Sequence, residues 1–363
     1  MDIYIYGAGR RCGMLIERLK EYKDIHIGGL ADSFSSGKRY GLELFDIFST
    51  DEVKLNIPVV ISVGNIQETV RIKKRLQEFG FTNIYWFWGK TKSFIGDFFK
   101  GECINLSDYK DGVILPSLEL HVSDYCNLNC AGCVHYSPLF DRVNPEFKTR
   151  IMDLKTISGL IDHVIMLSLL GGEPLVNPEL IRYIEEARRI FQGAGIQLIT
   201  NGLLIPQIDD ECFVALRENN ISVVISEYEP THNIIKRIRE KLDGARVDYS
   251  IRPYDNKQKF NRPLSIAKQT SHDLLCICDG CIGVCDGKIA RCPALLYIDK
   301  FNEIFHQNLP NKGIYLISEF NDGVSLINKM GERVPLCDYC IRDEMVWHRC
   351  NKPPKITDFA AMD

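Results

Sequence analysis

The sequence lacks a surplus of positive charge and a long hydrophobic run, and each absence excludes a class of protein. Its 363 residues include 44 Lys and Arg against 48 Asp and Glu, which leaves a net charge of −4. This balance provides no polycationic face, so we expect no nucleic acid partner. The longest apolar stretch, Val164 to Leu170, is far shorter than the roughly 18 residues that indicate a membrane-spanning helix. We therefore expect no membrane span.

A secretion signal is also missing, which changes how the 14 cysteines are interpreted. The first ten residues, MDIYIYGAGR, have no charged segment followed by a long apolar one and a cleavage site. We expect a cytoplasmic chain, where thiols stay reduced and clustered cysteines indicate metal or redox chemistry. Most of the cysteines fall into two groups, namely Cys126, Cys130 and Cys133, and Cys276, Cys278, Cys281, Cys285, Cys292, Cys337, Cys340 and Cys350.

Strand and helix patterns alternate along most of the chain, and a length of 363 residues suits two or three domains. In the first hundred residues we expect strands at Ile3–Tyr6, Ile25–Ala31, Val59–Val63 and Asn83–Trp88, with helices at Met14–Tyr22 and Glu68–Phe79. A second series has strands at Leu118–Val122, Val164–Leu169, Gln197–Thr200, Ser222–Ser226 and Arg246–Ile251, with helices at Leu154–Asp162, Pro178–Phe191, Asp209–Glu218 and Asn233–Leu242. Lys90 to Pro116 is expected to be a connector.

These patterns predict an α/β protein with three parts. Alternating strands and helices form parallel βαβ units, so residues 1–98 are expected to fold as one parallel sheet. About six such units in residues 118–255 predict an open, partial (β/α)6 barrel of the TIM type, whose active site lies where the strands end. Residues 256–363 are irregular and rich in cysteine, which predicts a small metal-supported extension.

The triplet Cys126, Cys130 and Cys133 directly follows the first expected barrel strand, with the spacing CxxxCxxC. A [4Fe–4S] cluster held by four cysteines is coordinatively complete, whereas three thiolates leave one iron open for another ligand. The spacing alone leaves two other interpretations. One is a zinc site completed by His135, and the other is three incidental thiols.

The segment CNLNCAGC, placed after a strand in a βα series, resembles the signature of the radical S-adenosylmethionine enzymes. The resemblance extends over roughly Leu118 to Pro253 and implies further cofactor-binding residues, namely Gly171, Gly172, Glu173 and Pro174 in GGEP, Asn201 in TNG, and Ser226. Gly132 stands where the family often has an aromatic residue, so we consider Tyr136 as a substitute contact to adenine. We find no GxIxG motif on the fifth strand.

The resemblance implies a mechanism as well as a cofactor set. S-adenosylmethionine would bind the open iron through its methionine group and be cleaved reductively to a 5′-deoxyadenosyl radical, which abstracts hydrogen from a C–H bond. The protein would position the substrate and exclude water. An oxidoreductase and an isomerase are both consistent with this chemistry, since the sequence does not choose between dehydrogenation and epimerisation. A reducing partner such as flavodoxin or ferredoxin is implied, whereas no general acid or base can be identified.

The second cysteine group is similar to the auxiliary-cluster extensions of this family, the SPASM type and the shorter Twitch type. Gly287 is followed by Cys292, and after 44 further residues come Cys337 and Cys340. We expect these three cysteines to bind one auxiliary [4Fe–4S] cluster. Its fourth ligand would come from Cys276, Cys278, Cys281 or Cys285, with a preference for Cys276 or Cys281. The alternative is structural zinc between the CxxC pairs 278/281 and 337/340.

An unused thiol of this group, such as Cys350, would either be structural or donate a hydrogen atom to a substrate radical. Nothing in the sequence spacing of Cys350 favours a ligand role. The two roles therefore remain open.

A glycine turn near the start, GAGRRCG, follows a strand and carries Gly7, Gly9 and Gly13. Asp32 ends the next expected strand, where an acidic residue would meet a ribose hydroxyl. The third glycine is one place late for GxGxxG. The region resembles the Rossmann-like modules of proteins that modify nucleotide sugars, which implies a nucleotide or nucleotide-sugar ligand at Gly7, Gly9 and Asp32. A structural or docking module is the alternative.

Taken together, the first hypothesis is a radical S-adenosylmethionine enzyme with two [4Fe–4S] clusters. It would act on a carbohydrate or nucleotide-linked sugar, because the chain has no peptide-recognition element of the winged-helix kind. A peptide-modifying enzyme of the SPASM type is the alternative within the same chemistry. The alternative from another class is a non-catalytic nucleotide-binding scaffold with structural zinc.

Overall fold

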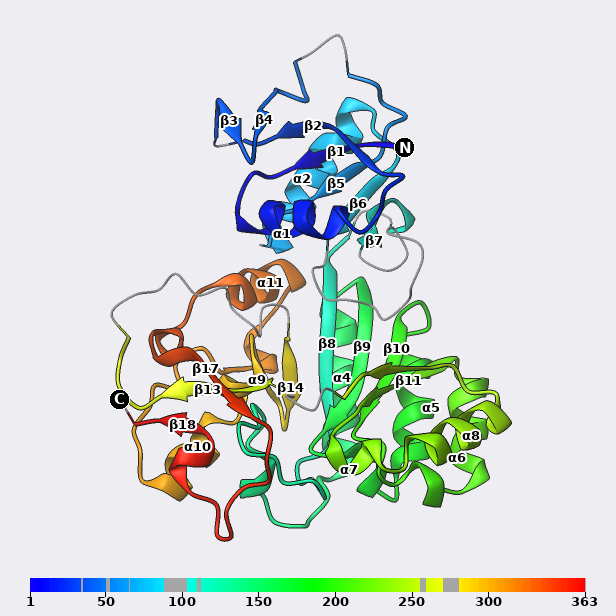
Figure 1. Cartoon of the computed structure of the whole chain (residues 1–363), viewed down its shortest axis with the longest axis vertical. Coiled ribbons are helices and arrows are strands. Elements are labelled where there is room, and N and C mark those ends of the chain that lie inside the picture. Colours follow the sequence, from blue (N-terminus) through cyan, green and yellow to red (C-terminus); the bar gives the residue numbers. More distant parts are fainter. Residues whose placement is uncertain are drawn as a thin grey trace. The chain divides into compact units, whose positions relative to one another are not determined.

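The computed structural model describes residues 1–33, 35–49, 53–64, 66–87, 103–109, 112–254, 259–269 and 281–362. The predicted ligands Cys276 and Cys278 therefore lie outside the described residues. The chain divides into two compact units, Met1–Gly112 and Val113–Asp363 (Figure 1). No helix among the described residues is long and apolar enough to cross a membrane.

The first unit is built on a five-stranded sheet in the order β2-β1-β5-β6-β7. Its strands are β1 (Asp2–Tyr6), β2 (His26–Ala31), β5 (Val59–Ile61), β6 (Ile84–Phe87) and β7 (Cys103–Asn105), with helices α1 (Arg10–Leu19) and α2 (Ile66–Phe79), and a small hairpin of β3 (Lys38–Arg39) and β4 (Leu42–Glu43). The pairs among β2, β1, β5 and β6 are parallel, and β7 pairs antiparallel with β6. Short, fully buried apolar strands such as Val59–Ile61 are typical of parallel sheets.

The second unit is built on an eight-stranded sheet in the order β12-β11-β10-β9-β8-β14-β15-β16. Its strands are β8 (Ile114–Ser123), β9 (His163–Gly171), β10 (Gly195–Thr200), β11 (Ile221–Ser226), β12 (Tyr249–Arg252), β14 (Gly283–Cys285), β15 (Lys288–Ala290) and β16 (Tyr315–Leu316). Strands β8 to β12 and β14 pair in parallel, whereas β15 and β16 pair antiparallel. The parallel part confirms the predicted α/β class and is consistent with a partial barrel.

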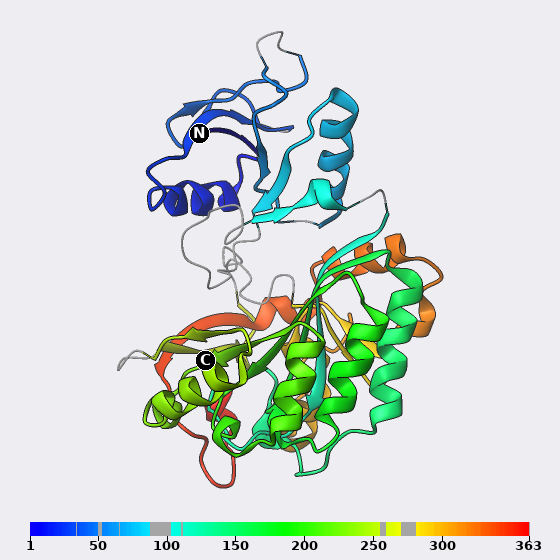
Figure 2. The ribbon, with the colours of Figure 1, turned by 90° about the vertical axis from the view of Figure 1, so that its right-hand side faces the viewer.

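Helices cover one face of the parallel strands (Figure 2). They are α4 (Phe147–Leu160), α5 (Leu180–Ile190), α6 (Asp210–Glu218) and α8 (Ile235–Ala245), preceded by the short α7 (Glu229–His232). Leu118, Leu120 and Leu198 alternate with polar residues along the strands and are almost completely buried. Because successive side chains of a strand point to opposite faces, the buried apolar set faces the helices.

The C-terminal region contributes a second, smaller sheet in the order β17-β13-β18. These strands are β13 (Lys259–Ser265), β17 (Cys340–Val346) and β18 (Ala360–Ala361), and the region also holds α9 (Pro293–Leu296), α10 (Ile298–Phe305), α11 (Gly323–Gly331) and the 3-10 helix η6 (Pro335–Tyr339). Its core centres on Phe301 and Phe359, which are fully buried. Strand β14 from this region continues the barrel sheet beside β8.

Three predicted element positions are wrong in detail. Residues expected to be a connector contain β7, which belongs to the first sheet, and the start of β8 at Ile114. The fifth barrel strand begins at Tyr249, because Arg246 adopts a left-handed conformation that ends α8. Among the described residues of the second unit, five parallel strands follow one another in chain order, whereas the sixth, β14, comes later in the chain and pairs with β8 on the side away from β9.

Candidate active site

The carboxyl ends of four neighbouring strands bring the sequence motifs together. The loop after β8 carries the cysteine triplet, β9 ends at Gly171 in GGEP, β10 ends at Thr200 in TNG, and β11 ends at Ser226. Parallel strands present their carboxyl ends at one edge of a sheet, which is where ligands bind in such folds. Motifs far apart in the sequence are therefore neighbours at this edge.

The two glycines of GGEP pass unusually close to the start of the cysteine loop. A Cβ atom on Gly171 would lie 2.0 Å from the Ser123 carbonyl oxygen, and one on Gly172 would lie 2.1 Å from that of Tyr125. The Gly172 amide donates to the Ser123 carbonyl at 2.7 Å, and the next amide donates to the Tyr125 carbonyl at 3.1 Å. Only residues without a side chain fit here, so the glycines fix how the two loops meet.

Glu173 is completely buried and holds GGEP against TNG. Its Oε1 accepts hydrogen bonds from the Thr200 hydroxyl at 2.6 Å and the Leu175 amide at 3.1 Å, and its Oε2 accepts from the Asn201 amide at 2.8 Å. Burial raises the pKa of this carboxyl to about 7, although the three hydrogen bonds favour the ionised form. The pairing of Glu173 with a methionine ammonium stays a prediction.

Asn201 extends this network to the cysteine loop. Its side-chain nitrogen donates to Asn127 Oδ1 at 2.7 Å and lies 3.7 Å from Cys126 Sγ. Its side-chain oxygen accepts from the Leu203 amide at 3.0 Å, which fixes the orientation of the amide group. A continuous chain of hydrogen bonds thus runs from GGEP through TNG to the first cysteine.

The three cysteines of the triplet share one apolar environment. Cys130 is buried with Leu128 and Trp347, and Cys126 and Cys133 pack against the same cluster. Burial raises the pKa of all three thiols, and for Cys130 the neighbouring Cys133 and Cys126 raise it further. A thiol with a raised pKa in a dry pocket fits a metal cluster, because bonding to iron replaces the lost hydration of the thiolate.

The chemistry of these side chains bears on the kind of metal they suit. Iron–sulfur clusters are held by cysteine thiolates, and all three donors of the triplet are thiols on one short loop. Among the described residues, no three His, Cys, Asp or Glu side chains are grouped tightly enough to hold a single metal ion. The donor set of the triplet suits the iron–sulfur cluster that the sequence predicts.

A C-terminal segment lies along the cysteine loop. The Ala131 amide donates to the His348 carbonyl at 2.9 Å, and the Cys350 amide donates to the Asn129 carbonyl at 2.8 Å. Cys350 is buried, and burial, then Asp358 and Cys133, raise the pKa of its thiol. This segment brings a fourth thiol close to the triplet, which the sequence placed with the auxiliary group.

The departure from the family pattern at Gly132 has a physical reason. Gly132 has a φ of +71°, and a Cβ there would lie 2.9 Å from the Phe260 ring. An aromatic ring from β13 thus occupies the space beside this position. Tyr136 is fully buried and packs against Phe301 and Phe359 in the C-terminal core. Its predicted contact with adenine remains untested.

Aromatic side chains that the sequence analysis missed lie beside the triplet. Tyr228 packs against Trp347 with ring centroids 5.5 Å apart and against Phe260 at 6.2 Å. Burial, followed by Cys130, raises the pKa of its hydroxyl well above 10. Tyr228 stands two residues beyond the half-buried Ser226, so its position after a barrel strand was a usable indication. Phe260 lies in β13 and Trp347 directly follows β17, both far along the chain from the triplet, and no sequence pattern indicated either of them.

The predicted auxiliary ligands surround the C-terminal core. Cys292 is buried in this core at the start of α9, and Cys337 and Cys340 pack against it from η6 and β17. Cys281 lies two residues before the start of β14 at Gly283. Cys285 ends β14, and burial raises the pKa of its thiol to about 12, although the Arg150 guanidinium favours the thiolate. An auxiliary cluster at these cysteines stays a prediction.

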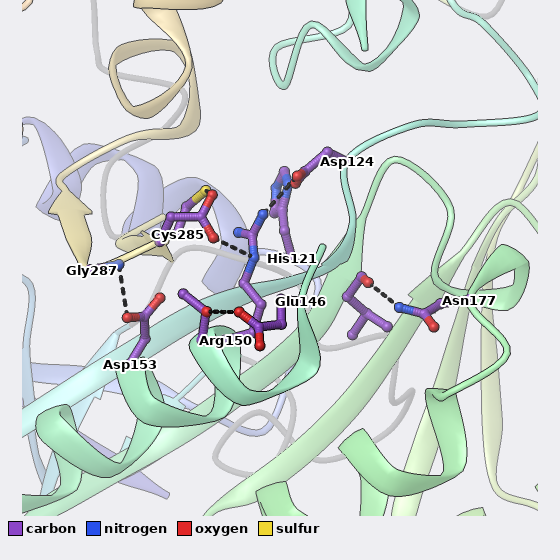
Figure 3. A network of polar contacts seen from close by, with 11 residues as sticks. His121, Asp124, Glu146, Arg150, Asp153, Asn177, Cys285 and Gly287 are labelled. Atoms are coloured by element: carbon purple, nitrogen blue, oxygen red, sulfur yellow. Dashed lines mark hydrogen bonds and ion pairs between the residues drawn. The ribbon is translucent and has the colours of Figure 1, made fainter. Parts of the chain in front are cut away.

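A buried ion-pair network joins β8, α4 and the β14–β15 turn (Figure 3). Arg150 is fully buried and contacts Asp124 at 2.6 Å and Asp286 at 3.3 Å. Asp153, one turn later on α4, accepts from the Gly287 amide at 2.9 Å. Asp124 lies two residues before the first cysteine. The network therefore anchors the cysteine loop and the auxiliary region to the same helix.

The N-terminal glycine turn uses Asp32 for its own support. The Asp32 carboxylate accepts from the Ala8 amide at 2.6 Å and from the Ser35 amide at 2.8 Å. Gly7 has a φ of +107°, and a Cβ there would lie 2.8 Å from Val63, whereas one on Gly9 would meet no atom within 4 Å. Asp32 thus holds the turn that Gly7 and Gly9 form, and a nucleotide at this turn remains a prediction.

Comparison with known proteins shows that part of the second unit is similar to a known family. Residues 120–247 match the Radical SAM superfamily. A GTP 3′,8-cyclase of Clostridium acetobutylicum is 29% identical over 31% of this chain and 36% of its own length. A GTP 3′,8-cyclase of Staphylococcus epidermidis is 28% identical over 39% of this chain and 44% of its own length. The chain thus spans less than half the length of these relatives.

Solved structures were found with low overall similarity. The crystal structure of BtrN in complex with AdoMet and 2-DOIA is 16% identical, covers 64% of this chain and 94% of that one, and has a TM-score of 0.41. The structure of anSMEcpe with bound AdoMet is 24% identical, covers 38% of this chain and 42% of that one, and has a TM-score of 0.30.

Proposed function

Since the chain carries a radical SAM domain at residues 120–247, we propose that it is an enzyme that removes hydrogen from a carbohydrate or a nucleotide-linked sugar. Cys126, Cys130 and Cys133 would hold a [4Fe–4S] cluster, and the carboxyl edge of β9, β10 and β11 would hold S-adenosylmethionine. When bound, these two cofactors supply reductive cleavage of a carbon–sulfur bond, which yields an oxidant able to attack an unactivated C–H bond.

The hydrogen-bond chain from Glu173 to Cys126 is the observation that carries this proposal. Asn201 contacts the cysteine loop through its side chain and Glu173 through its backbone amide. A scaffold with incidental thiols has no need to connect these motifs through a fully buried carboxylate, because burial of such a group is unfavourable. A cofactor that contacts both the cysteines and the strand ends requires these motifs to be held at fixed positions relative to one another.

The chain's own residues have distinct tasks in this proposal. Gly171 and Gly172 let the GGEP turn pack directly against the backbone of Ser123 and Tyr125, which holds the end of β9 beside the cysteine loop. Glu173 holds Asn201 in place, and Ser226 and Tyr228 follow the next strand at the same edge. The aromatic rings beside the triplet exclude water from the cluster, which protects a reactive intermediate from side reactions.

The sugar substrate of this proposal comes from the sequence. The N-terminal region resembles modules of proteins that modify nucleotide sugars, and its glycine turn follows β1 as it does in those modules. A row of polar side chains, Glu119, Ser168, Gln197 and Ser222, also crosses β8, β9, β10 and β11. This row lies deeper in the sheet than the carboxyl edge, since Ser222 is four residues before the end of β11 at Ser226.

The auxiliary cluster and the electron donor belong to the same proposal. Cys292, Cys337 and Cys340, with a fourth cysteine of the group 276, 278, 281 and 285, would bind the second [4Fe–4S] cluster. It would accept an electron if the outcome is dehydrogenation. A small reducing protein such as flavodoxin or ferredoxin would supply the electron that starts the reaction.

Anaerobic purification followed by metal and product analysis tests the proposal. About eight irons per chain are expected for two cubane clusters, with release of 5′-deoxyadenosine after reduction. Cys130→Ala should lose the first cluster and all 5′-deoxyadenosine release, while Cys212→Ala, a buried cysteine of α6, should keep both. Stoichiometric zinc with no nucleoside product would instead establish the scaffold. Retained cofactor cleavage in Cys130→Ala would refute the ligand assignment.

A further inference from the structure

Trp347 is held against the cysteine loop by the backbone on its C-terminal side. Cys130 forms an isolated antiparallel bridge with Arg349. The next amide of the loop, that of Ala131, donates to the His348 carbonyl at 2.9 Å. Strand β17 ends at Val346, immediately before Trp347. Both sides of Trp347 are therefore anchored, and its side chain has a fixed position over the loop.

The indole ring of Trp347 is part of the apolar cluster around Cys130. The residue is 9% exposed and packs with Leu128 and Cys130. Its ring nitrogen is buried, and no acceptor among the described residues completes a hydrogen bond with it. A buried donor without a partner is unfavourable, so such a group indicates an acceptor that is bound from outside the chain or a changed state of a neighbour.

The acceptor that the geometry favours is the sulfur of Cys130. Trp347, Leu128 and Cys130 form one small buried cluster, and of the two side chains that pack with the indole in it, only that of Cys130 has an atom that can accept a hydrogen bond. A neutral thiol is a weak acceptor. A thiolate carrying negative charge is a much stronger one, because hydrogen bonds to charged groups are about twice as strong.

Another tryptophan of the chain shows how an indole N–H is normally satisfied. Trp86 is 2% exposed, and its ring nitrogen donates to the Val63 carbonyl at 2.8 Å. The two buried indoles therefore differ in one respect. Trp86 has a carbonyl partner within the chain, whereas the Trp347 ring nitrogen has no partner in the part of the chain that the structure describes and packs in one cluster with a predicted cluster ligand.

We propose that the Trp347 Nε1–H donates a hydrogen bond to Cys130 Sγ when the cysteine triplet binds its [4Fe–4S] cluster, and that this bond raises the reduction potential of that cluster. The inference rests on the proposed function, since it requires the cluster. Reduction adds negative charge to the cluster, and a hydrogen bond to a ligand sulfur stabilises the more negative state. Trp347 thus makes the cluster easier to reduce by its electron donor.

Trp347→Phe tests this directly, because it removes the N–H and keeps an aromatic ring. The reduction potential is measured by titration under anaerobic conditions, followed by electron paramagnetic resonance at the signal that changes when S-adenosylmethionine is added. Trp347→Phe should shift the potential to more negative values with its iron content retained. Trp86→Phe, the same change at an indole that already has a partner, should leave the potential unchanged. Equal potentials in all three proteins would overturn the inference.

A second measurement uses the unaltered chain and so does not depend on how the variant folds. Tryptophan labelled in its ring with a magnetic nitrogen isotope should give a nitrogen coupling in the pulsed spectrum of the reduced cluster. A cluster without this coupling would overturn the inference while the proposed function stands. A purified protein without any iron–sulfur cluster would overturn the proposed function itself.

Discussion

Thr200→Val removes the hydroxyl that connects Glu173 to the TNG turn without changing the volume of the side chain. In the structure this hydroxyl donates to Glu173 Oε1 at 2.6 Å and accepts from the Gly202 amide at 2.9 Å. Both contacts are buried. The substitution therefore takes a donor from a buried carboxylate and leaves a buried amide without its acceptor.

The expected loss of stability depends on pH. Burial raises the pKa of Glu173 from 4.5 to about 7 in the folded protein, so the folded state loses stability as the pH rises from about 4.5 through 7, where the buried carboxyl has to ionise. The Thr200 hydroxyl offsets part of this cost, because it favours the ionised form. Thr200→Val should therefore lower the free energy of unfolding by about 2 kcal/mol at low pH and about 3–4 kcal/mol at high pH.

Denaturant unfolding of the metal-free protein at about one and a half pH units on either side of the Glu173 pKa measures both values. Thr200→Ser is the matched control, since it keeps the hydroxyl and loses a methyl group worth about 1 kcal/mol. Its loss should be the same at both pH values. An equal loss for Thr200→Val at both pH values, or a loss no larger than that of Thr200→Ser, would refute the role given to this hydrogen bond.

Three further substitutions, the first with a matched control, test the surroundings of the site. Gly172→Ala places a Cβ 2.1 Å from the Tyr125 carbonyl oxygen, so it should abolish cooperative thermal unfolding of the second unit. The control is Gly159→Ala, at a helical position with no atom within 4 Å, which should stabilise that unit by about 0.5–1 kcal/mol. Burial raises the pKa of Asp153 from 3.8 to about 6, so Asp153→Asn should raise the free energy of unfolding by about 2 kcal/mol above pH 6 and by nothing below pH 4; a gain independent of pH would contradict this. Arg150→Met leaves two carboxylates without their buried cation and should cost about 3–5 kcal/mol in chemical denaturation.

Much of the active-site edge could be predicted from the sequence, because local rules determine it. Short apolar runs bounded by turns indicated four strands. One precedes the cysteine triplet, and the others end at or next to Gly171, Thr200 and Ser226. Parallel strands place their carboxyl ends at one edge, so the convergence of these motifs followed from their order alone. The connection of Glu173 to Thr200 and Asn201 is a consequence of that convergence.

Contacts made by the C-terminal region could not be predicted in the same way. Trp347, Phe260 and Cys350 reach the cysteine loop through pairing between β13 and β17 and through the segment that follows. No periodicity in the sequence indicates which distant strands will pair. Asp32 is a case in which a sequence pattern indicated one role and the structure shows another contact. Its position at the end of a strand suggested a contact with ribose, whereas its carboxylate accepts hydrogen bonds from the turn beside it.

The open iron of the first cluster is the claim on which the account depends, and Cys350 lies near enough to challenge it. Mössbauer spectroscopy of protein reconstituted with isotope-enriched iron, with and without S-adenosylmethionine, tests it most directly. The account predicts that one iron of one cluster changes its isomer shift when S-adenosylmethionine is added, equally in the unaltered chain and in Cys350→Ala. Spectra that do not respond to S-adenosylmethionine, with an iron site that changes only in Cys350→Ala, would contradict it.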